Sequence, residues 1–436
     1  DIGRLLVNTD YNVKGYVQAK GHIGGSLYNP NFNGTVTSNL LVINGEGISN
    51  VDGTIYADKT VINLENFGFD EENGGRYTAR AGMSLVGDKR LFGTLQITNG
   101  RVSNLLALLG KPVDTLDGSL SGTVDLGGTY NNPNINVVGS INNVSIDDKV
   151  VGDAKVDVAL ENRKFKIRTL KLPVDDGLVA AGGTIDLDGD ADLQIAVRDV
   201  DIKPFLPLIG KDIKATGSVT GVINMTGATK NPKVELSASL ANGSYNGIDI
   251  DQGFVLATMQ DHVINVQRIQ GAKGDYKLSV YGRIPLAALY TTGYLDANDS
   301  KAMDMTVDFN EAGMAVIPLV TDTVQDATGA LKGVVHITGA LDQPQAYGTV
   351  SVRNGTMKIK SLGNDIKNID GDLIFSGQQG DFQSRISMGK GSAGLAAKIN
   401  WTGHTMTSYR MAAQLEGLNI ANEYVDGPLN GALYIA

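Results

Sequence analysis

The sequence predicts an all-β fold, and three features of its composition and patterning support this prediction. Among 436 residues there are 55 glycines against 11 prolines, and only 19% of the residues are charged. The apolar residues make up 42% of the chain and alternate with polar ones over long stretches. A period of two is typical of strands with one buried and one solvated face. The frequent glycines indicate tight turns between these strands.

A repeated glycine pattern sets the expected domain organisation. Three segments carry glycines at offsets 0, 4 and 10 and a proline at offset 15 from the first glycine. These repeat residues are Gly118, Gly122, Gly128 and Pro133, then Gly217, Gly221, Gly227 and Pro232, then Gly329, Gly333, Gly339 and Pro344. A weaker copy begins at Gly15, with Ala19 in place of its second glycine, and a fifth begins at Gly427. The copies start 103, 99, 112 and 98 residues apart, so the period is close to one hundred residues.

The repeat divides the chain into full and partial units. We expect full units at residues 15–117, 118–216, 217–328 and 329–426, with the end of a unit at 1–14 and the start of another at 427–436. The first residues contain neither an initiating Met nor a signal peptide. We therefore expect the chain to be a piece of a longer protein.

Each unit is expected to open with a β-hairpin whose two strands have one apolar side. After the first strand, the step from the third repeat glycine to Asn-Pro or Gln-Pro has the residues of a turn. The residues expected on the apolar side are Leu120, Val124, Leu126, Val219, Ile223, Met225, Leu331, Val335, Ile337, Val350 and Val352. The pairs Asn142-Asn143, Asn242-Gly243, Asn354-Gly355 and Asp370-Gly371 are expected to form further turns.

A short helix is expected before each new unit, within residues 102–109, 202–209, 312–320 and 420–424. In the first of these stretches Leu105, Leu106 and Leu109 fall on one helical stripe. Prolines in the second and third stretches keep the helices short or irregular. We interpret these stretches as caps or plugs on the sheet, and the alternative is that they are loops with buried apolar side chains.

Composition and charge exclude several classes of function. Without cysteine the chain has no disulfides and no thiolate metal sites. The formal net charge of −10 and the lack of a Lys- and Arg-rich stretch argue against a nucleic-acid partner. The best apolar runs, 105–109 and 315–320, are far shorter than the roughly 18 to 20 residues of a membrane-spanning helix.

No residue pattern predicts catalysis, a metal or a cofactor. The four histidines, His22, His262, His336 and His404, lie in different sequence contexts. Glycine pairs such as Gly182-Gly183 are interpreted as turn residues, because none has a phosphate-binding pattern. The alternating carboxylates from Asp186 to Asp192 could bind Ca²⁺, but they lack a distal bidentate Glu and fit a hairpin turn better. We therefore expect that the protein is not an enzyme.

The repeated hairpin and the Leu- and Pro-rich step before it resemble a known family. The glycine-spaced strand with its Asn-Pro turn, preceded by a helical step such as Ile202 to Gly210, is similar to the TamB proteins of the AsmA-like superfamily. These are inner-membrane components of the translocation and assembly module. The resemblance extends over essentially the whole chain, although a single motif has low specificity.

The resemblance implies a fold, a location and a function. The fold is an elongated, continuous β-sheet bent into a U-shaped, taco-like groove. The location is the periplasm of a diderm bacterium, as a segment of a protein anchored in the inner membrane. The function is bridge-like transport of phospholipids, whose acyl chains are shielded by the groove, in support of outer-membrane lipid homeostasis. The implied partners are phospholipids and, through regions outside this chain, an outer-membrane β-barrel protein of the Omp85 type.

Three alternatives stay open from the sequence. The same alternation fits a closed structural solenoid or adhesin-like rod. It also fits a factor for outer-membrane protein assembly that conducts no lipid. A polysaccharide enzyme built on a solenoid is a further alternative, but Trp401 is the sole tryptophan and the carboxylates do not cluster on one face.

Overall fold

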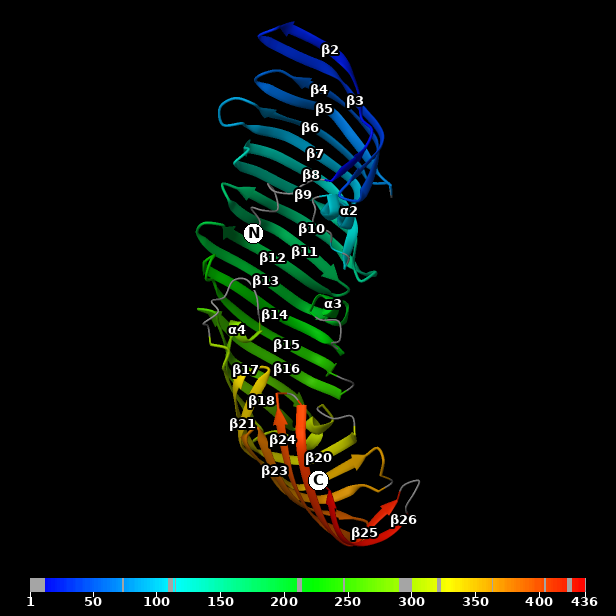
Figure 1. Ribbon diagram of the computed structural model, residues 1–436, viewed down its shortest axis with the longest axis vertical. Helices are drawn as coiled ribbons and strands as arrows, with labels where there is room; N and C mark the ends of the chain where they lie inside the picture. Colours follow the sequence, from blue (N-terminus) through cyan, green and yellow to red (C-terminus); the bar gives the residue numbers. More distant parts are fainter. Residues whose placement is uncertain are drawn as a thin grey trace. The chain divides into compact units, whose positions relative to one another are not determined.

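The computed structural model confirms an all-β fold. It describes residues 12–72, 74–108, 113, 115–209, 214–245, 248–289, 300–319, 323–362, 364–403, 405–421 and 426–435. Most of these residues belong to antiparallel strands (Figure 1). The chain divides into a first unit, residues 1–213 with 224–230, and a second unit, residues 214–223 with 231–436. Strand β14 (Ala215–Ala228) contributes residues to both units.

The first unit is an antiparallel meander. Its strands are β1 (Val13–Gly15), β2 (Gln18–Ser26), β3 (Asn29–Ile43), β4 (Glu46–Ala57), β5 (Val61–Glu71), β6 (Arg76–Ser84), β7 (Leu91–Arg101), β8 (Leu116–Thr129), β9 (Asn132–Ile146), β10 (Lys149–Glu161), β11 (Lys164–Val174), β12 (Gly177–Asp186) and β13 (Asp190–Asp201). From β3 to β13 each strand pairs with the next in the chain. Strands β1 and β2 both pair with β3, along different parts of its length.

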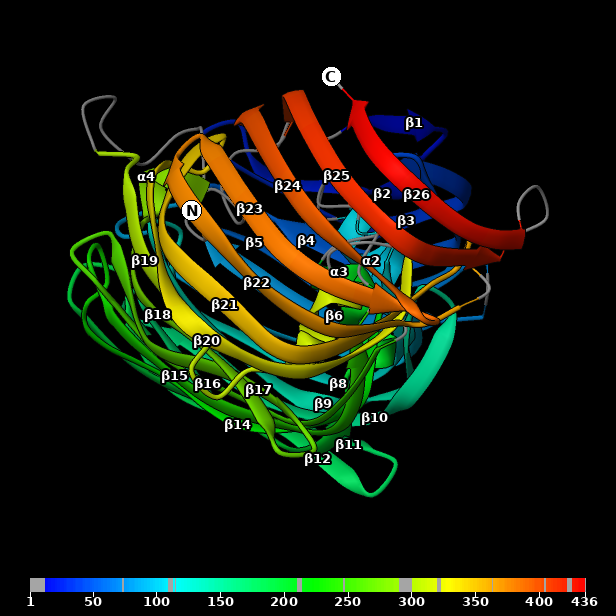
Figure 2. The ribbon, with the colours of Figure 1, turned by 90° about the horizontal axis from the view of Figure 1, so that it is seen from below.

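The second unit repeats this arrangement. Its further strands are β15 (Lys233–Tyr245), β16 (Ile248–Gln260), β17 (Val263–Lys273), β18 (Tyr276–Pro285), β19 (Met303–Asp308), β20 (Val324–Ala340), β21 (Gln343–Ile359), β22 (Ile366–Gly377), β23 (Gln379–Met388), β24 (Gly391–Thr402), β25 (Thr405–Ala421) and β26 (Asp426–Ile435). From β15 to β25 each strand pairs antiparallel with the next in the chain. Strands β21 to β24 are visibly bent along their length (Figure 2).

The glycines at the third repeat position share one backbone conformation. Gly25, Gly128, Gly227 and Gly339 have φ of 85°, 77°, 82° and 89°. L-residues rarely adopt this region, so glycine is the default residue there. In the first unit Gly128 pairs with Pro133 across the turn that joins β8 to β9. Local chemistry thus explains why the hairpin turns at this point.

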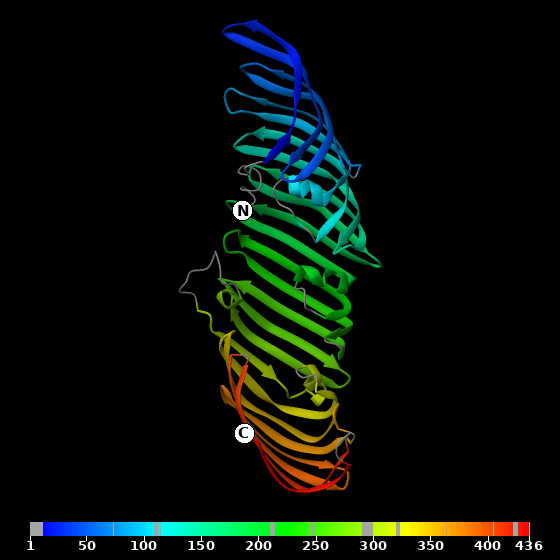
Figure 3. The same ribbon diagram turned by 45° about the vertical axis from the view of Figure 1, so that its right-hand side comes forward.

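The short helices lie close to where the sequence predicts them, with two differences. Helix α2 spans Val102–Leu108, the 3₁₀ helix η1 and helix α3 span Lys203–Phe205 and Leu206–Ile209, and the 3₁₀ helix η2 spans Met314–Leu319. Helices α2 and α3 lie at the same edge of the first unit's strands (Figures 1 and 3).

The helix predicted at 420–424 is contradicted at its first two residues. Ile420 and Ala421 end strand β25, because they continue its pairing with β26, and residues 422–424 lie outside the described residues. Helix α4 (Leu286–Leu289), which follows β18, was not expected. Its four residues are too few to produce a helical period in the sequence.

The prediction of turns at four Asn- or Asp-containing pairs is wrong. Asn142-Asn143, Asn242-Gly243, Asn354-Gly355 and Asp370-Gly371 lie inside strands β9, β15, β21 and β22. Asn143, Asn242 and Asn354 do have positive φ, at 52°, 48° and 53°. The strand pairing shifts at Asn143 and Asn354, which makes these residues β-bulges rather than turns. Bulges bend a strand and strengthen its twist, so Asn143 and Asn354 curve the sheet instead of ending their strands.

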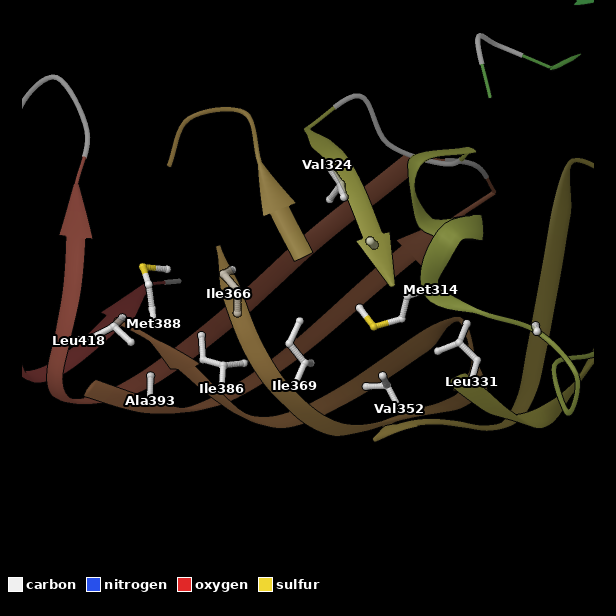
Figure 4. Packing of buried hydrophobic residues seen from close by; sticks show 12 residues of the cluster. Met314, Val324, Leu331, Val352, Ile366, Ile369, Ile386, Met388, Ala393 and Leu418 are labelled. Atoms are coloured by element: carbon white, nitrogen blue, oxygen red, sulfur yellow. The ribbon is translucent and has the colours of Figure 1, made fainter. Parts of the chain in front are cut away.

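The largest buried cluster belongs to the second unit. It joins Met314 of η2 to residues of β20 to β25, and Figure 4 shows the labelled side chains on the concave side of the bent strands. The buried members are Ala312, Met314, Val324, Ala327, Leu331, Val352, Ile366, Ile369, Ile386, Met388, Ala393 and Leu418. In the first unit, one smaller cluster lies beside α2 and another is contacted by Phe205 of η1.

Candidate functional site

The most distinctive feature of the first unit is a sheet face made of unbroken apolar rows. A row is the set of residues that face one another across successive strands. One row runs through Ile55, Leu64, Ala81, Gly93, Leu126, Ile135, Leu160, Phe165, Ile185 and Ala191, from β4 to β13. The neighbouring row, from β6 to β13, consists of Ala79, Leu95, Val124, Val137, Val158, Ile167, Gly183 and Leu193. We call this side of the strands the apolar face.

The opposite side of the same strands is polar. Asp125 lies between Val124 and Leu126 on β8 and points to this opposite side. Its row consists of Arg80, Thr94, Asp125, Asn136, Ala159, Lys166, Thr184 and Asp192. Only Ala159 in this row lacks a polar side chain. Successive residues of a strand point to opposite faces, so the alternation in the sequence becomes a segregation in space.

The second unit has an apolar face of the same kind. One row passes from β15 to β25 through Ala238, Val255, Ile269, Val280, Val307, Val335, Gly348, Phe375, Gly380, Ile399 and Tyr409. Another passes from β20 to β26 through Gly333, Val350, Leu373, Phe382, Ala397, Met411 and Ile435. Apolar rows therefore extend across the strands, not along one of them.

Much of each apolar face is neither fully buried nor fully exposed. In the first unit Leu170 is 36% exposed, and in the second unit Ile269 and Met411 are 43% and 45% exposed. Burial is complete mainly beside the helices, as at Leu120 (9% exposed) near α2 and Leu331 (7%) near η2. Half-exposed apolar side chains in contiguous rows are what a surface for apolar ligands requires.

Eight of the eleven residues that the sequence predicts for the apolar side fall on these faces. Leu120, Val124 and Leu126 share the apolar face of the first unit. Leu331, Val335, Ile337, Val350 and Val352 share that of the second, where Leu331 faces Val352 across β20 and β21. Val219, Ile223 and Met225 lie on β14 at spacings of four and two residues, which puts them on one side of that strand. Ile223 is 37% exposed.

A buried carboxylate that anchors α2 was missed by sequence reasoning. Glu71 is 3% exposed and sits at the end of β5, on the apolar side with Phe67 and Phe69. The Tyr77 hydroxyl donates to Glu71 Oε1 at 2.5 Å, and the backbone N–H of Arg101 donates to Oε2 at 3.0 Å. A glutamate in the apolar register of a strand is the signal that could have revealed this site.

This carboxylate holds the start of α2 against the sheet. Asn104 of α2 donates its amide to Glu71 Oε2 at 3.5 Å, and the Tyr77 ring stacks on Phe69 with centroids 4.6 Å apart. Burial and the adjacent Glu71 both raise the pKa of Tyr77. At the other end of the helix, Asn44 donates to the carbonyl of Leu108 at 3.0 Å. Both ends of α2 are thus fixed beside the apolar face.

The carboxylates with a lowered pKa lie away from the apolar face, either on the polar face or in turns. Thr60 and Tyr56 bind the Asp58 carboxylate and lower its pKa to about 2. Asn50 and Arg76 lower the pKa of Asp70, and Ser351 and Arg353 lower that of Asp372. Because these groups are solvated and paired, they mark a water-facing surface.

The other chemical candidates from the sequence have structural surroundings. Asp186, at the end of β12, forms an ion pair with Lys164 at 3.6 Å, and Asp188, in the turn between β12 and β13, forms one with Arg163 at 2.5 Å. His336 lies on the polar side of β20, with Nδ1 3.0 Å from Thr306 Oγ1. His22 and His262 are exposed, and His404 lies outside the described residues.

The described part of the chain offers neither a metal site nor a membrane-spanning helix. Within those residues, no group of three or more His, Cys, Asp or Glu side chains is placed to hold a metal ion. No helix among them is long and apolar enough to cross a membrane.

Comparisons with known proteins give no match. No protein-family model, curated protein or solved structure is significantly similar to this chain. The resemblance to TamB proteins therefore rests on the residues alone, and the candidate site rests on its own geometry.

Proposed function

We propose that the chain is a segment of a lipid conduit in the envelope of a diderm bacterium, in which the apolar faces shield phospholipid acyl chains between the inner and outer membranes. The observation that carries this proposal is the unbroken apolar row that includes Leu126 and crosses ten strands of the first unit. Such a row continues at right angles to the strands, which is the direction in which a conduit would run. In this proposal the sheet forms an elongated, taco-like groove.

The energetics of the face suit acyl chains. Each methylene that leaves water for an apolar surface is stabilised by about 0.8 kcal/mol. Val, Ile, Leu, Ala and Gly make up most of the lining, so successive strands present similar surfaces of methyl groups. Similar surfaces bind a chain with similar strength, which favours movement along the row. The polar face remains in water, and so does a lipid headgroup at the open side of the groove.

The proposal is tested by pairing substitutions on opposite faces of β8. Val124→Asp places a carboxylate on the apolar face, whereas Thr123→Asp places one on the polar face, one residue away. We expect Val124→Asp to lower the amount of phospholipid that copurifies with the protein, as measured by native mass spectrometry. Thr123→Asp should retain the wild-type amount, and circular dichroism should show that both variants are folded.

Photocrosslinking in cells provides the second arm of the test. A photoreactive amino acid at Leu126 should crosslink to phospholipid, and the same residue at Asp125 should not. Absence of lipid from the purified wild-type protein, together with equal crosslinking at both positions, would rule out the conduit.

A structural rod is the second candidate, and one observation favours it. Around η2 the apolar side of the second unit is filled by the chain's own residues, with Met314 only 2% exposed. A rod requires this kind of filled interior along its length. Retention of wild-type envelope integrity by Val124→Asp would favour the rod. A lipid-independent role in outer-membrane protein assembly predicts instead that the same variant impairs assembly without any change in bound lipid.

A further inference from the structure

A partly open apolar cavity lies on the second unit's apolar face, beside η2. It has a volume of about 210 Å³ and is lined by the end of β17, the start of β18 and η2, with Ile250 and the exposed Asp249 from the start of β16 at one side. Ile269, Leu278 and Val280 form its floor, and Val316 of η2 covers it. Almost all of the lining is carbon, so the cavity offers a water molecule few hydrogen-bond partners.

A glycine leaves this cavity open although neither the backbone nor the packing demands glycine there. Gly271 faces Gly253 on one neighbouring strand and Leu278 on the other. A Cβ at Gly271 would meet no atom within 4 Å, and the residue has no positive φ. A Cβ would therefore fit, the cavity offers space beyond it, and an apolar residue would be favoured by strand propensity. The space above Gly271 is a hole in an otherwise apolar row.

The side of the cavity next to η2 is built by a close contact between a glycine and an aromatic ring. Gly313 is buried, and a Cβ there would lie 2.5 Å from the ring of Tyr276. Its lack of a side chain lets η2 approach the ring. The backbone N–H of Val316 donates to the carbonyl of Gly313 at 3.2 Å, which fixes the turn that carries Val316 over the cavity. Lys273 and Lys277 also line the cavity, and both are exposed.

The volume matches a short length of hydrocarbon. A cavity of about 150 Å³ lined by apolar residues binds benzene, so 210 Å³ holds roughly eight carbon atoms. A polar ligand would find no buried partner there, whereas the end of a straight acyl chain would contact carbon along the floor and under η2. The two exposed lysines leave the polar part of such a molecule in water.

We propose that this cavity is a docking site for the methyl end of an acyl chain. A lipid would pause there with one chain end under η2, so that the second unit contains a discrete station and not only a uniform surface. This inference rests on the proposed function, because it concerns the same ligand class on the same face. It adds where a lipid would pause, which end of its acyl chain would enter the cavity, and which residue, Gly271, keeps the cavity open.

The test fills the cavity and compares it with an equivalent change on the other face. Gly271→Leu places a side chain into the cavity. Gly394→Leu is the matched control: Gly394 is also inside a strand, a Cβ there would meet nothing within 4 Å, and it lies on the polar side between Arg385 and Gln414. The Cβ meets no atom within 4 Å in either variant, so both should keep a melting temperature close to that of the wild type, which is measured alongside.

The probe is palmitic acid with a diazirine close to its methyl end, and the labelled peptides are identified by mass spectrometry. For the wild-type protein and Gly394→Leu, we expect labelling concentrated on peptides that contain Ile269, Val280 and Val316. Gly271→Leu should lower labelling of these peptides by about tenfold or more, since the leucine occupies the space of about four of the eight carbons. Labelling of apolar-face peptides of the first unit should persist.

The possible outcomes separate the two proposals. Unchanged labelling of the cavity peptides in Gly271→Leu would overturn the docking site while leaving the conduit intact. Labelling confined to the cavity would support the docking site and contradict the conduit. A wild-type protein without labelling on any apolar-face peptide would overturn both.

Discussion

The two units bury their apolar faces to different extents. In the second unit, Met314 and eleven other buried residues form a continuous cluster on the concave side of the bent strands (Figure 4). In the first unit the buried residues near α2 are Tyr77, Ile97 and Leu120, and the rows beyond them are half-exposed. The alternation in the sequence is the same in both units, so alternation alone does not decide whether a face is filled or open.

The difference comes from the segment that each unit places on its face. Helix α2 contacts the sheet through Val102 and Leu105, at one end of the strands, and is held there by Glu71. Segment η2 instead inserts Met314 between Leu331, Val352 and the bulge glycine Gly355. A short helix can therefore act as a plug at the margin or as part of the core, depending on which side chain it presents.

The largest effect should come from removing the central side chain of the filled cluster. Met314→Ala should lower the free energy of unfolding by about 2 to 5 kcal/mol, because it leaves a cavity in a core that cannot collapse fully. The matched change in the first unit is Leu105→Ala on α2. It removes a half-buried side chain and should lower the free energy of unfolding by about 1 to 2 kcal/mol. Denaturant titration followed by hydrogen exchange of peptides from each unit measures both values. Equal losses would contradict the contrast between a filled and an open face.

A smaller loss of stability should follow from crowding the Tyr77–Glu71 hydrogen bond that anchors α2. Gly100→Ala places a Cβ 2.3 Å from the Tyr77 hydroxyl oxygen, which displaces the ring from Glu71. Overpacking of this kind costs about 1 to 3 kcal/mol. Gly47→Ala is the control, since its nearest neighbour would be Leu40 Cδ1 at 3.9 Å. Faster hydrogen exchange of residues 102–108 in Gly100→Ala alone would confirm the anchor, and unchanged exchange would contradict it.

The smallest effect concerns acid stability. Asp58, Asp70, Glu161 and Asp188 of the first unit and Asp372 of the second have lowered pKa values because of their hydrogen-bonding and charged partners. A carboxylate with a lowered pKa stabilises the fold above its unfolded pKa, and this contribution disappears as pH falls through the folded value. For Asp58, with a folded pKa of about 2, the loss falls between about pH 4 and pH 2.

The two units should therefore respond differently to acid. More of these carboxylates among the described residues belong to the first unit, so it should lose structure at a higher pH than the second. Trp401, the sole tryptophan, lies in the second unit near Phe375 and reports on it by fluorescence. Far-ultraviolet circular dichroism should decline before this fluorescence changes. Coincident transitions would show that the solvated carboxylates do not set the acid stability of the first unit.

The strand content, the apolar register and the hairpin turns were predictable because they depend on neighbouring residues in the chain. Asp125 stands between Val124 and Leu126 in the sequence, and successive residues of a strand point to opposite faces. Its place on the polar face, opposite the two apolar side chains, therefore follows from strand geometry. The bulges were not predictable in this way. Asn354 has the same preference for positive φ in a turn and in a bulge, and only its partner strand decides which forms.

The sequence by itself determined that this protein is a series of antiparallel strands with one apolar and one polar face, because alternation and turn chemistry act over a few residues. Only the tertiary structure decided where that apolar face is filled, as at Met314, and where it keeps space, as above Gly271. Filling depends on which distant segment comes to lie on the face and on how the bulges bend it. Those are contacts between residues far apart in the chain, and no local pattern encodes them.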